Sequence, residues 1–102
     1  MYMKLAGHEF EGPLMDCSSL KGHPGVFAVI TVWDGTPVLM DVDSGPDVKK
    51  AVKAHPRKKA WRHLSKPVGY AFVVQYQTKG HQSDRETLVS EVRDKMDVPC
   101  GN

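Results

Sequence analysis

The segment from Gly25 to Val42 reads GVFAVITVWDGTPVLMDV, and the interpretation of the rest of the chain starts from it. Its first part, up to Val32, is rich in β-branched and aromatic residues, which favours a strand. Asp34-Gly35 is a strong turn signal, and residues 38–42 read as a second strand. Pro37 stands at the start of that strand, where a missing backbone N–H is tolerated. The segment therefore predicts an antiparallel β-hairpin.

Residues 44–47, SGPD, end this hairpin and predict the start of a helix. Ser44 or Gly45 can cap the helix, and the proline suits its first turn. Pro56 ends it, because the residue before a proline avoids the helical region. Residues 57–64 then predict a second short helix. The inward stripe of the first helix is formed by Val48, Ala51 and Val52.

Residues 69–77 alternate in the manner of a third strand, and a last helix follows. The helix opens at Ser83, and Glu86 completes the S-x-x-E spacing of a capping box. The expected buried face of this helix consists of Leu88, Val89, Val92 and Met96. These elements predict an α+β fold in which helices flank a small three-stranded, mostly antiparallel sheet.

Length and composition favour one domain. The chain has 102 residues, of which 40% are hydrophobic and 25% charged, as in ordinary folded proteins. We expect a single domain over residues 1–102, with residues 25–102 as its core and residues 1–24 as an N-terminal lid or strand segment. No apolar run is long enough to span a bilayer, and no signal-peptide pattern is present, so a cytoplasmic protein without membrane contact is expected. Cys17 and Cys100 are expected to be free thiols.

Charge is strongly segregated, although the net charge is only +2. From Val48 to Ser83 there are nine Lys or Arg residues and no Asp or Glu, and eight of the nine lie between Lys49 and Lys66. Such a block predicts a polyanionic partner, DNA or RNA, since cationic side chains bind phosphates whatever the sequence. A solvated helix face explains the block equally well. The candidate nucleic-acid contacts are Lys49, Lys50, Lys53, Arg57, Lys58, Lys59 and Arg62.

From Gly25 to Asn102 the order of these elements resembles the GIY-YIG nuclease domain. The resemblance rests on Gly25-Val26-Phe27, a strand ending in Asp43-Ser44, the helix VKKAVKAHP at residues 48–56, and a final helix running from Glu86 to Pro99. It implies a three-stranded antiparallel sheet flanked by helices, in agreement with the pattern of strands and helices above.

The same resemblance implies that most catalytic groups of the family are replaced. The family's first tyrosine falls on Phe27, its second motif on Met40 and Val42, and its arginine on Ala51. None of these side chains can transfer a proton or contact a phosphate with a charge. Because losing one transition-state donor costs on the order of 10²–10³ in rate, the resemblance implies a domain without nuclease chemistry.

Glu86 and the terminal Asn102 match two remaining family positions, a metal-binding glutamate and an asparagine. A role for Glu86 as a Mg²⁺ ligand competes with its role in the capping box, which already explains a glutamate three residues after Ser83. In a working nuclease with an altered site, Lys50 or His55 would assist.

Two other features have both a functional and a structural interpretation. Asp41 and Asp43 are two residues apart on a strand and therefore share a face. They can bind a hard cation, although Asp43 also suits the turn that follows. Trp61 can stack on a base, and it can equally anchor the core between Ala60 and Leu64.

Three functions stay open at this point. The first is a catalytically inactive GIY-YIG-like module that binds nucleic acid through the basic segment. The second is a metal-dependent endonuclease with an altered site, and the third is a protein-interaction or homodimer module. No cofactor is expected, apart from Mg²⁺ in the nuclease case.

Overall fold

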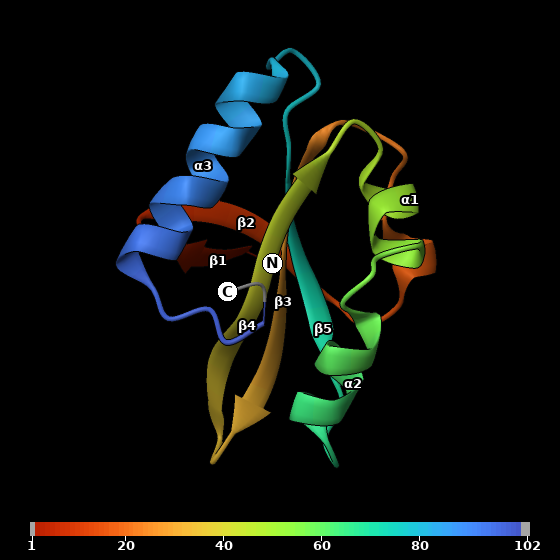
Figure 1. The fold of residues 1–102 in the computed structure, drawn as a ribbon, viewed down its shortest axis with the longest axis vertical. Helices are drawn as coiled ribbons and strands as arrows, with labels where there is room; N and C mark the ends of the chain where they lie inside the picture. The colour runs from red at the N-terminus through yellow and green to blue at the C-terminus, as the bar shows by residue number, and fades with distance from the viewer. Residues whose placement is uncertain (1, 101–102) are drawn as a thin grey trace.

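A five-stranded antiparallel sheet forms the centre of the computed structural model, which describes residues 2–100 (Figure 1). The strands are β1 (Tyr2–Leu5), β2 (His8–Leu14), β3 (Gly25–Trp33), β4 (Thr36–Gly45) and β5 (Ala71–Tyr76). The helices are α1 (Val48–Lys53), α2 (Lys58–Ser65) and α3 (Gln82–Lys95), with a short 3₁₀ turn, η1 (Cys17–Ser19). An α+β architecture is therefore confirmed.

The predicted hairpin is confirmed as β3 and β4, which pair antiparallel from Gly25↔Gly45 to Trp33↔Thr36. Asp34 and Gly35 form its turn with φ angles of 53° and 77°, as a type I′ turn requires. β4 is longer at both ends than the expected strand over residues 38–42.

The prediction of three strands is wrong in number, because the N-terminal segment adds two more. The strand order is β1-β2-β5-β3-β4, so the three expected strands form one side of the sheet and β2 extends it beyond β5. The β2 register to β5 shifts between Glu11 and Leu14. Gly12 and Pro13 interrupt this stretch in the sequence, and they hide the alternation by which a strand is recognised.

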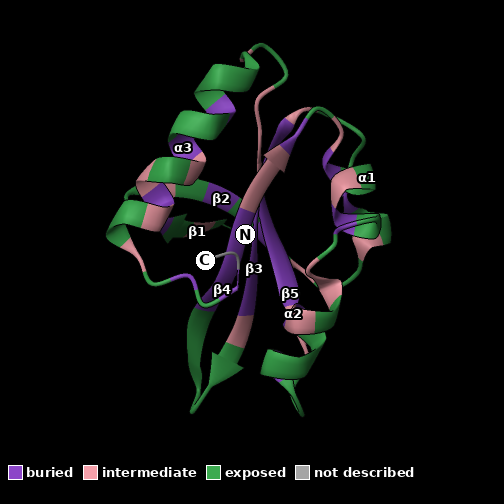
Figure 2. Ribbon diagram, viewed as in Figure 1, coloured by how far each residue is buried: buried purple, intermediate pink, exposed green. Residues whose placement is uncertain are grey.

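Helices cover both faces of the sheet (Figure 1). On one face Leu88 and Val92 of α3 pack against a cluster that includes Val26 and Val42. On the other face Trp61 of α2 packs with residues from α1 and from the opposite side of the strands. Figure 2 shows the buried residues concentrated in the strands between these layers, while the outer helix faces are exposed. The expected buried face of the last helix is thus confirmed.

The helix starts differ from expectation in two places. Asp47, rather than Ser44 or Gly45, caps α1, since its Oδ1 accepts a hydrogen bond from the Lys50 backbone N–H at 3.0 Å. At α3, the Asp84 carboxylate accepts from the His81 backbone N–H at 2.9 Å.

The predicted capping box of Ser83 and Glu86 is therefore wrong, because the helix begins earlier, at Gln82. The Glu86 Oε1 instead accepts from the Gln82 amide at 2.8 Å.

Among residues 2–100, no helix combines the length and apolar character needed to cross a bilayer.

Candidate functional site

Asp41 is a fully buried carboxylate at the centre of β4. Its Oδ2 accepts hydrogen bonds from Arg57 Nε and from Trp61 Nε1, both at 2.7 Å. Its Oδ1 accepts from the Val42 backbone N–H at 2.8 Å and from Arg57 Nη2 at 3.2 Å. A buried carboxylate is stable only when its lone pairs are satisfied in this way. Asp41 thus fastens α2 to the sheet.

A β-bulge explains why Asp41 points toward α2. Val29 pairs with Asp41, whereas the next residue, Ile30, pairs with Leu39, so one extra residue lies in β4. The neighbouring Met40 belongs to the cluster on the α1–α2 face. Two consecutive residues of β4 therefore face the same helices, which a regular strand does not allow.

Asp43 continues this polar cluster toward the surface. Its Oδ2 lies 2.8 Å from His55 Nε2 and 3.3 Å from Arg57 Nη2, and its Oδ1 accepts from the Ser44 backbone N–H at 2.8 Å. The Arg57 backbone N–H donates to His55 Nδ1 at 3.1 Å. Because Nδ1 accepts, the ring proton is on Nε2 and is donated to Asp43. Both ring nitrogens of His55 therefore have structural partners.

The surroundings of this cluster favour the charged form of the Arg57 guanidinium and the neutral form of the Cys100 thiol. The hydrogen bond with Asp41 raises the pKa of Arg57 above its ordinary value. Burial, and then the nearby Asp41 carboxylate, raise the pKa of Cys100. Cys17 and Cys100 are both free, as expected.

The predicted metal ligands Asp41 and Asp43 do lie on the same face of the sheet, but the donors around them are side chains of the protein. Within residues 2–100, no group of three or more His, Cys, Asp or Glu side chains is arranged to hold a metal ion. Trp61 is fully buried, so its indole is not available to stack on a base, and it serves as the core anchor.

Most of the predicted nucleic-acid contacts lie on α1 and α2, which cover the same face of the sheet (Figure 1). Arg57 differs from the rest, since its guanidinium binds Asp41 and Asp43. Lys58 is half-buried and its Nζ donates to the Lys53 carbonyl at 3.2 Å. The exposed members are Lys49, Lys50, Lys53, Lys59 and Arg62, and the exposed Lys66 follows α2 directly.

The weak catalytic candidates Glu86, Lys50 and His55 do not line a common cavity. Glu86 lines a cavity of 440 Å³ between the end of β4 and α3, together with Asp43. Lys50 and His55 are not among the residues that line it. Lys50 is exposed on α1, and His55 is packed against Trp61, with 4.7 Å between ring centroids.

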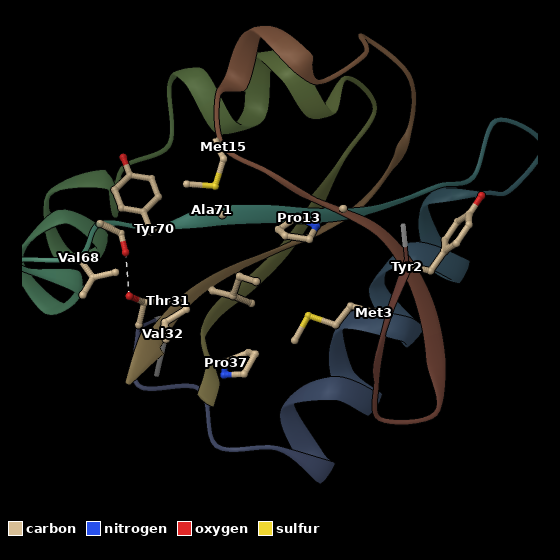
Figure 3. A pocket seen from close by; sticks show the side chains of 13 residues that line it. Tyr2, Met3, Pro13, Met15, Thr31, Val32, Pro37, Val68, Tyr70 and Ala71 are labelled. Carbon is tan, nitrogen blue, oxygen red and sulfur yellow. Dashed lines mark hydrogen bonds between the residues drawn. The ribbon is translucent and has the colours of Figure 1, made fainter. Parts of the chain in front are cut away.

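The sequence reasoning missed an apolar end of the molecule. Four exposed side chains, Tyr2, Met15, Val32 and Val68, line a cavity of 340 Å³ that contains almost no polar surface (Figure 3). Figure 3 shows that the lining side chains come from β1, from β2 and the residue after it, from the β3–β4 hairpin, and from the segment that leads into β5. Their contributions are spread over five short stretches of sequence, so no single motif reveals the cavity.

A second cavity of 340 Å³ adjoins the first, because both are lined by Thr31, Val32 and Val68. The exposed Trp33 and Leu64 line this second cavity. We call the exposed apolar residues that line the two cavities the apolar end; they are Tyr2, Met15, Val32, Trp33, Leu64 and Val68. An exposed patch of this kind is typical of an interaction surface.

Comparison of the chain with family models, curated proteins and solved structures finds no match. The GIY-YIG resemblance therefore rests on the sequence pattern. The residues at its replaced positions, Phe27, Met40 and Val42, are buried in the core, and Ala51 is half-buried on α1. Asn102 lies outside the described residues.

Proposed function

We propose that the protein is a nucleic-acid-binding module, of GIY-YIG-like type without nuclease chemistry, that binds DNA or RNA through α1, α2 and the residue after α2. The observation that carries this proposal is the concentration of exposed cations on one face. Lys49 and Lys53 are one helical turn apart on α1, and Lys59, Arg62 and Lys66 have the spacing i, i+3, i+7 along α2 and its end.

The cations of this face are also unpaired within the described residues. The ion pairs found in residues 2–100 involve His8, His55, Arg57 and Arg93, and none involves a lysine. Because no carboxylate holds them in an ion pair among residues 2–100, these lysines remain available to a polyanion. Phosphate contacts of this type supply affinity without sequence preference, and the buried Trp61 is not available for base stacking.

Fluorescence-anisotropy titrations of labelled duplex DNA and of single-stranded RNA at two salt concentrations test the proposal. The wild type is expected to bind at least one of them, with an affinity that falls steeply as salt rises. Changing Lys49, Lys53 and Lys59 to Glu should weaken binding strongly. The slope of log K against log salt should become shallower by about 3, because about 0.9 counterion is released per phosphate contact.

A matched control changes Lys4, Lys79 and Lys95, three exposed lysines outside the segment, to Glu. This variant has the same net charge as the first, so a general charge effect would weaken both equally. Equal affinities in the two variants, or an affinity of the first variant equal to that of wild type, would refute the proposed surface. Cleavage of the DNA in the presence of Mg²⁺, lost on Glu86→Ala, would instead support the endonuclease alternative.

A second candidate function, a homodimer module, is favoured by the apolar end. β4 is an edge strand of the sheet, and the exposed Trp33 and Val38 lie beside that edge. A second copy of the chain could pair with it antiparallel, which is a self-complementary arrangement. Light scattering would then give a mass of twice 11.3 kDa, and Trp33→Lys should return the protein to the monomer mass. A monomer mass for the wild type would exclude this function.

A further inference from the structure

Arg85 is a buried arginine on the inner face of α3. Only 7% of the residue is exposed, and it precedes Leu88 and Val92 by three and seven residues, so all three lie on the stripe that faces the sheet. Its Nε is buried and has no hydrogen-bond partner within residues 2–100. Its guanidinium takes part in none of the ion pairs found there.

This arrangement differs from that of the other arginines near the sheet. Arg57 is bound by two carboxylates, and Arg93 donates to the Val42 carbonyl at 2.8 Å. Burying the Nε of a guanidinium without a partner is costly, because no interaction replaces the hydration of that N–H. The cost is removed if an anion from outside the chain completes the site.

A cavity next to Arg85 has the room for such an anion. The 440 Å³ space between the end of β4 and α3 is lined by Arg85 and by three neutral polar side chains, Ser44, Gln82 and Ser90. Two serine hydroxyls from opposite walls can donate hydrogen bonds to different oxygens of one ligand. Gly45 and Pro46 form part of the wall without adding charge.

Two carboxylates also line the cavity, and their partners decide how far they oppose an anion. Asp43 Oδ2 accepts hydrogen bonds from His55 and from Arg57, which it shares with Asp41, so its charge is partly offset. Glu86 is held by the neutral amide of Gln82, so its charge remains and should weaken anion binding. Arg93 also lines the cavity, but its guanidinium is engaged by Asp41 at 3.6 Å and by the Val42 carbonyl, so Arg85 is the cation on which anion binding depends.

We propose that this cavity binds a compact oxyanion of the phosphate type, with Arg85 as the residue that receives it. A guanidinium donates two parallel N–H bonds to a phosphate, and the serine hydroxyls reach its remaining oxygens. The site is separate from the lysines of α1 and α2 and does not depend on nucleic-acid binding by them. Inorganic phosphate and the terminal phosphate of an oligonucleotide present the same oxygens.

Titration of ¹⁵N-labelled full-length protein with inorganic phosphate, followed by amide chemical shifts, tests the proposal. The wild type should show saturable shifts at residues 44–46 and in α3 around Arg85. Arg85→Met, which keeps the apolar stem, should weaken binding about tenfold or more. Arg85→Lys keeps the charge but loses the paired donors, so it should bind with intermediate affinity. The control Lys95→Met removes one charge from an exposed position of the same helix and should bind like wild type.

Glu86→Gln separates this site from a metal site. Removal of the opposing carboxylate should tighten phosphate binding, whereas weaker binding would contradict the proposal. Absence of saturable shifts in the wild type, or equal affinity in Arg85→Met and wild type, would also overturn it. The variant with Lys49, Lys53 and Lys59 changed to Glu should still bind phosphate, so the two proposals can fail separately.

A pair of oligonucleotides, with and without a 5′-phosphate, identifies the source of the oxyanion. If the phosphorylated strand alone shifts the amides of residues 44–46, the ligand is a terminal phosphate of nucleic acid. If neither strand shifts them while inorganic phosphate does, the ligand is a free phosphate compound. Both results support a phosphate-type site.

Discussion

The Asp41 cluster and the Arg85 cavity are two places where this small protein buries charge, and they treat it in opposite ways. Asp41 is fully buried and receives hydrogen bonds from Arg57 and Trp61. Arg85 is nearly as deeply buried, yet its Nε has no partner within the described residues. The hydrogen bonds of the buried Asp41 carboxylate are supplied by the protein itself, whereas the Arg85 Nε lacks an acceptor within residues 2–100.

The two places therefore differ in the role of their charges. Those of the Asp41 cluster stabilise the fold, whereas we propose that Arg85 binds a ligand. Removing one partner of a buried ion pair strongly destabilises the fold, because the other charge is left buried without a partner. A buried charge without a partner is already unfavourable, so its removal should cost little. Stability measurements on the two places can therefore test this comparison directly.

The largest effect is expected for Asp41→Ala. The substitution leaves the Arg57 Nε and the Trp61 N–H without their acceptor, and the free energy of unfolding should fall by about 3–5 kcal/mol. Urea denaturation followed by tryptophan fluorescence measures it. Asp94→Ala, at an exposed position, is the control and should stay within about 0.5 kcal/mol of wild type. A loss of under 1 kcal/mol for Asp41→Ala would show that the Asp41 cluster does not stabilise the fold.

A smaller loss is expected for Trp61→Phe, which keeps a ring in the core and removes the N–H that donates to Asp41 at 2.7 Å. A hydrogen bond to a charged group contributes about 1.5–3 kcal/mol, so we expect a loss of about 2 kcal/mol in urea denaturation. Trp33→Phe, at a position that is 74% exposed, should leave stability unchanged. If the two tryptophan variants are equally stable, the bond to Asp41 does not hold α2 to the sheet.

Arg85→Met tests whether the buried arginine is needed for stability. Since an unpaired buried guanidinium is replaced by an apolar side chain of similar length, stability without ligand should stay within about 1 kcal/mol of wild type or rise. Thermal unfolding in a phosphate-free buffer measures it, and phosphate should then stabilise the wild type more than the variant. A loss of more than 2 kcal/mol without ligand would make Arg85 a structural residue.

The smallest effect concerns pH. Burial raises the pKa of Cys100 from its ordinary value of 9.0, so the thiol ionises more easily in the unfolded chain. The stabilisation is present below pH 9 and is lost as the pH rises through the folded-state pKa. Unfolding free energies measured from pH 8 to 11 should therefore fall more steeply for wild type than for Cys100→Ala. The control Cys17→Ala should follow wild type, and parallel curves for all three proteins would contradict this expectation.

Local patterns predicted the central elements well, because their signals lie in neighbouring residues. The turn at Asp34-Gly35 and the stripe of Leu88 and Val92 are examples, and both are confirmed. Arg85 lies on the same stripe as Leu88 and Val92. A positive charge on the face of a helix that is expected to be buried could have indicated a functional residue from the sequence. The capping box was misassigned because Ser83 has the correct spacing to Glu86, although His81 and Asp84 make the actual contact.

The added strands and the Asp41 cluster were not predictable in the same way. β2 pairs both with its neighbour β1 and with β5, which lies far along the chain, and Gly12 and Pro13 hide its alternation in the sequence. Asp41 meets Arg57 across sixteen residues, and it faces α2 only because a bulge in β4 turns it there. Pairings of this kind depend on where distant segments pack.

The amino-acid sequence alone determined the hairpin, the order of the helices and the block of positive charge, since each depends on residue type and short-range spacing. The packing of the folded chain sets which charges are paired and which apolar side chains remain exposed, and it leaves the Nε of the buried Arg85 without a partner within residues 2–100. The physical reason is that burial and charge pairing depend on neighbours in space, and the folded chain brings those neighbours together from segments far apart along it.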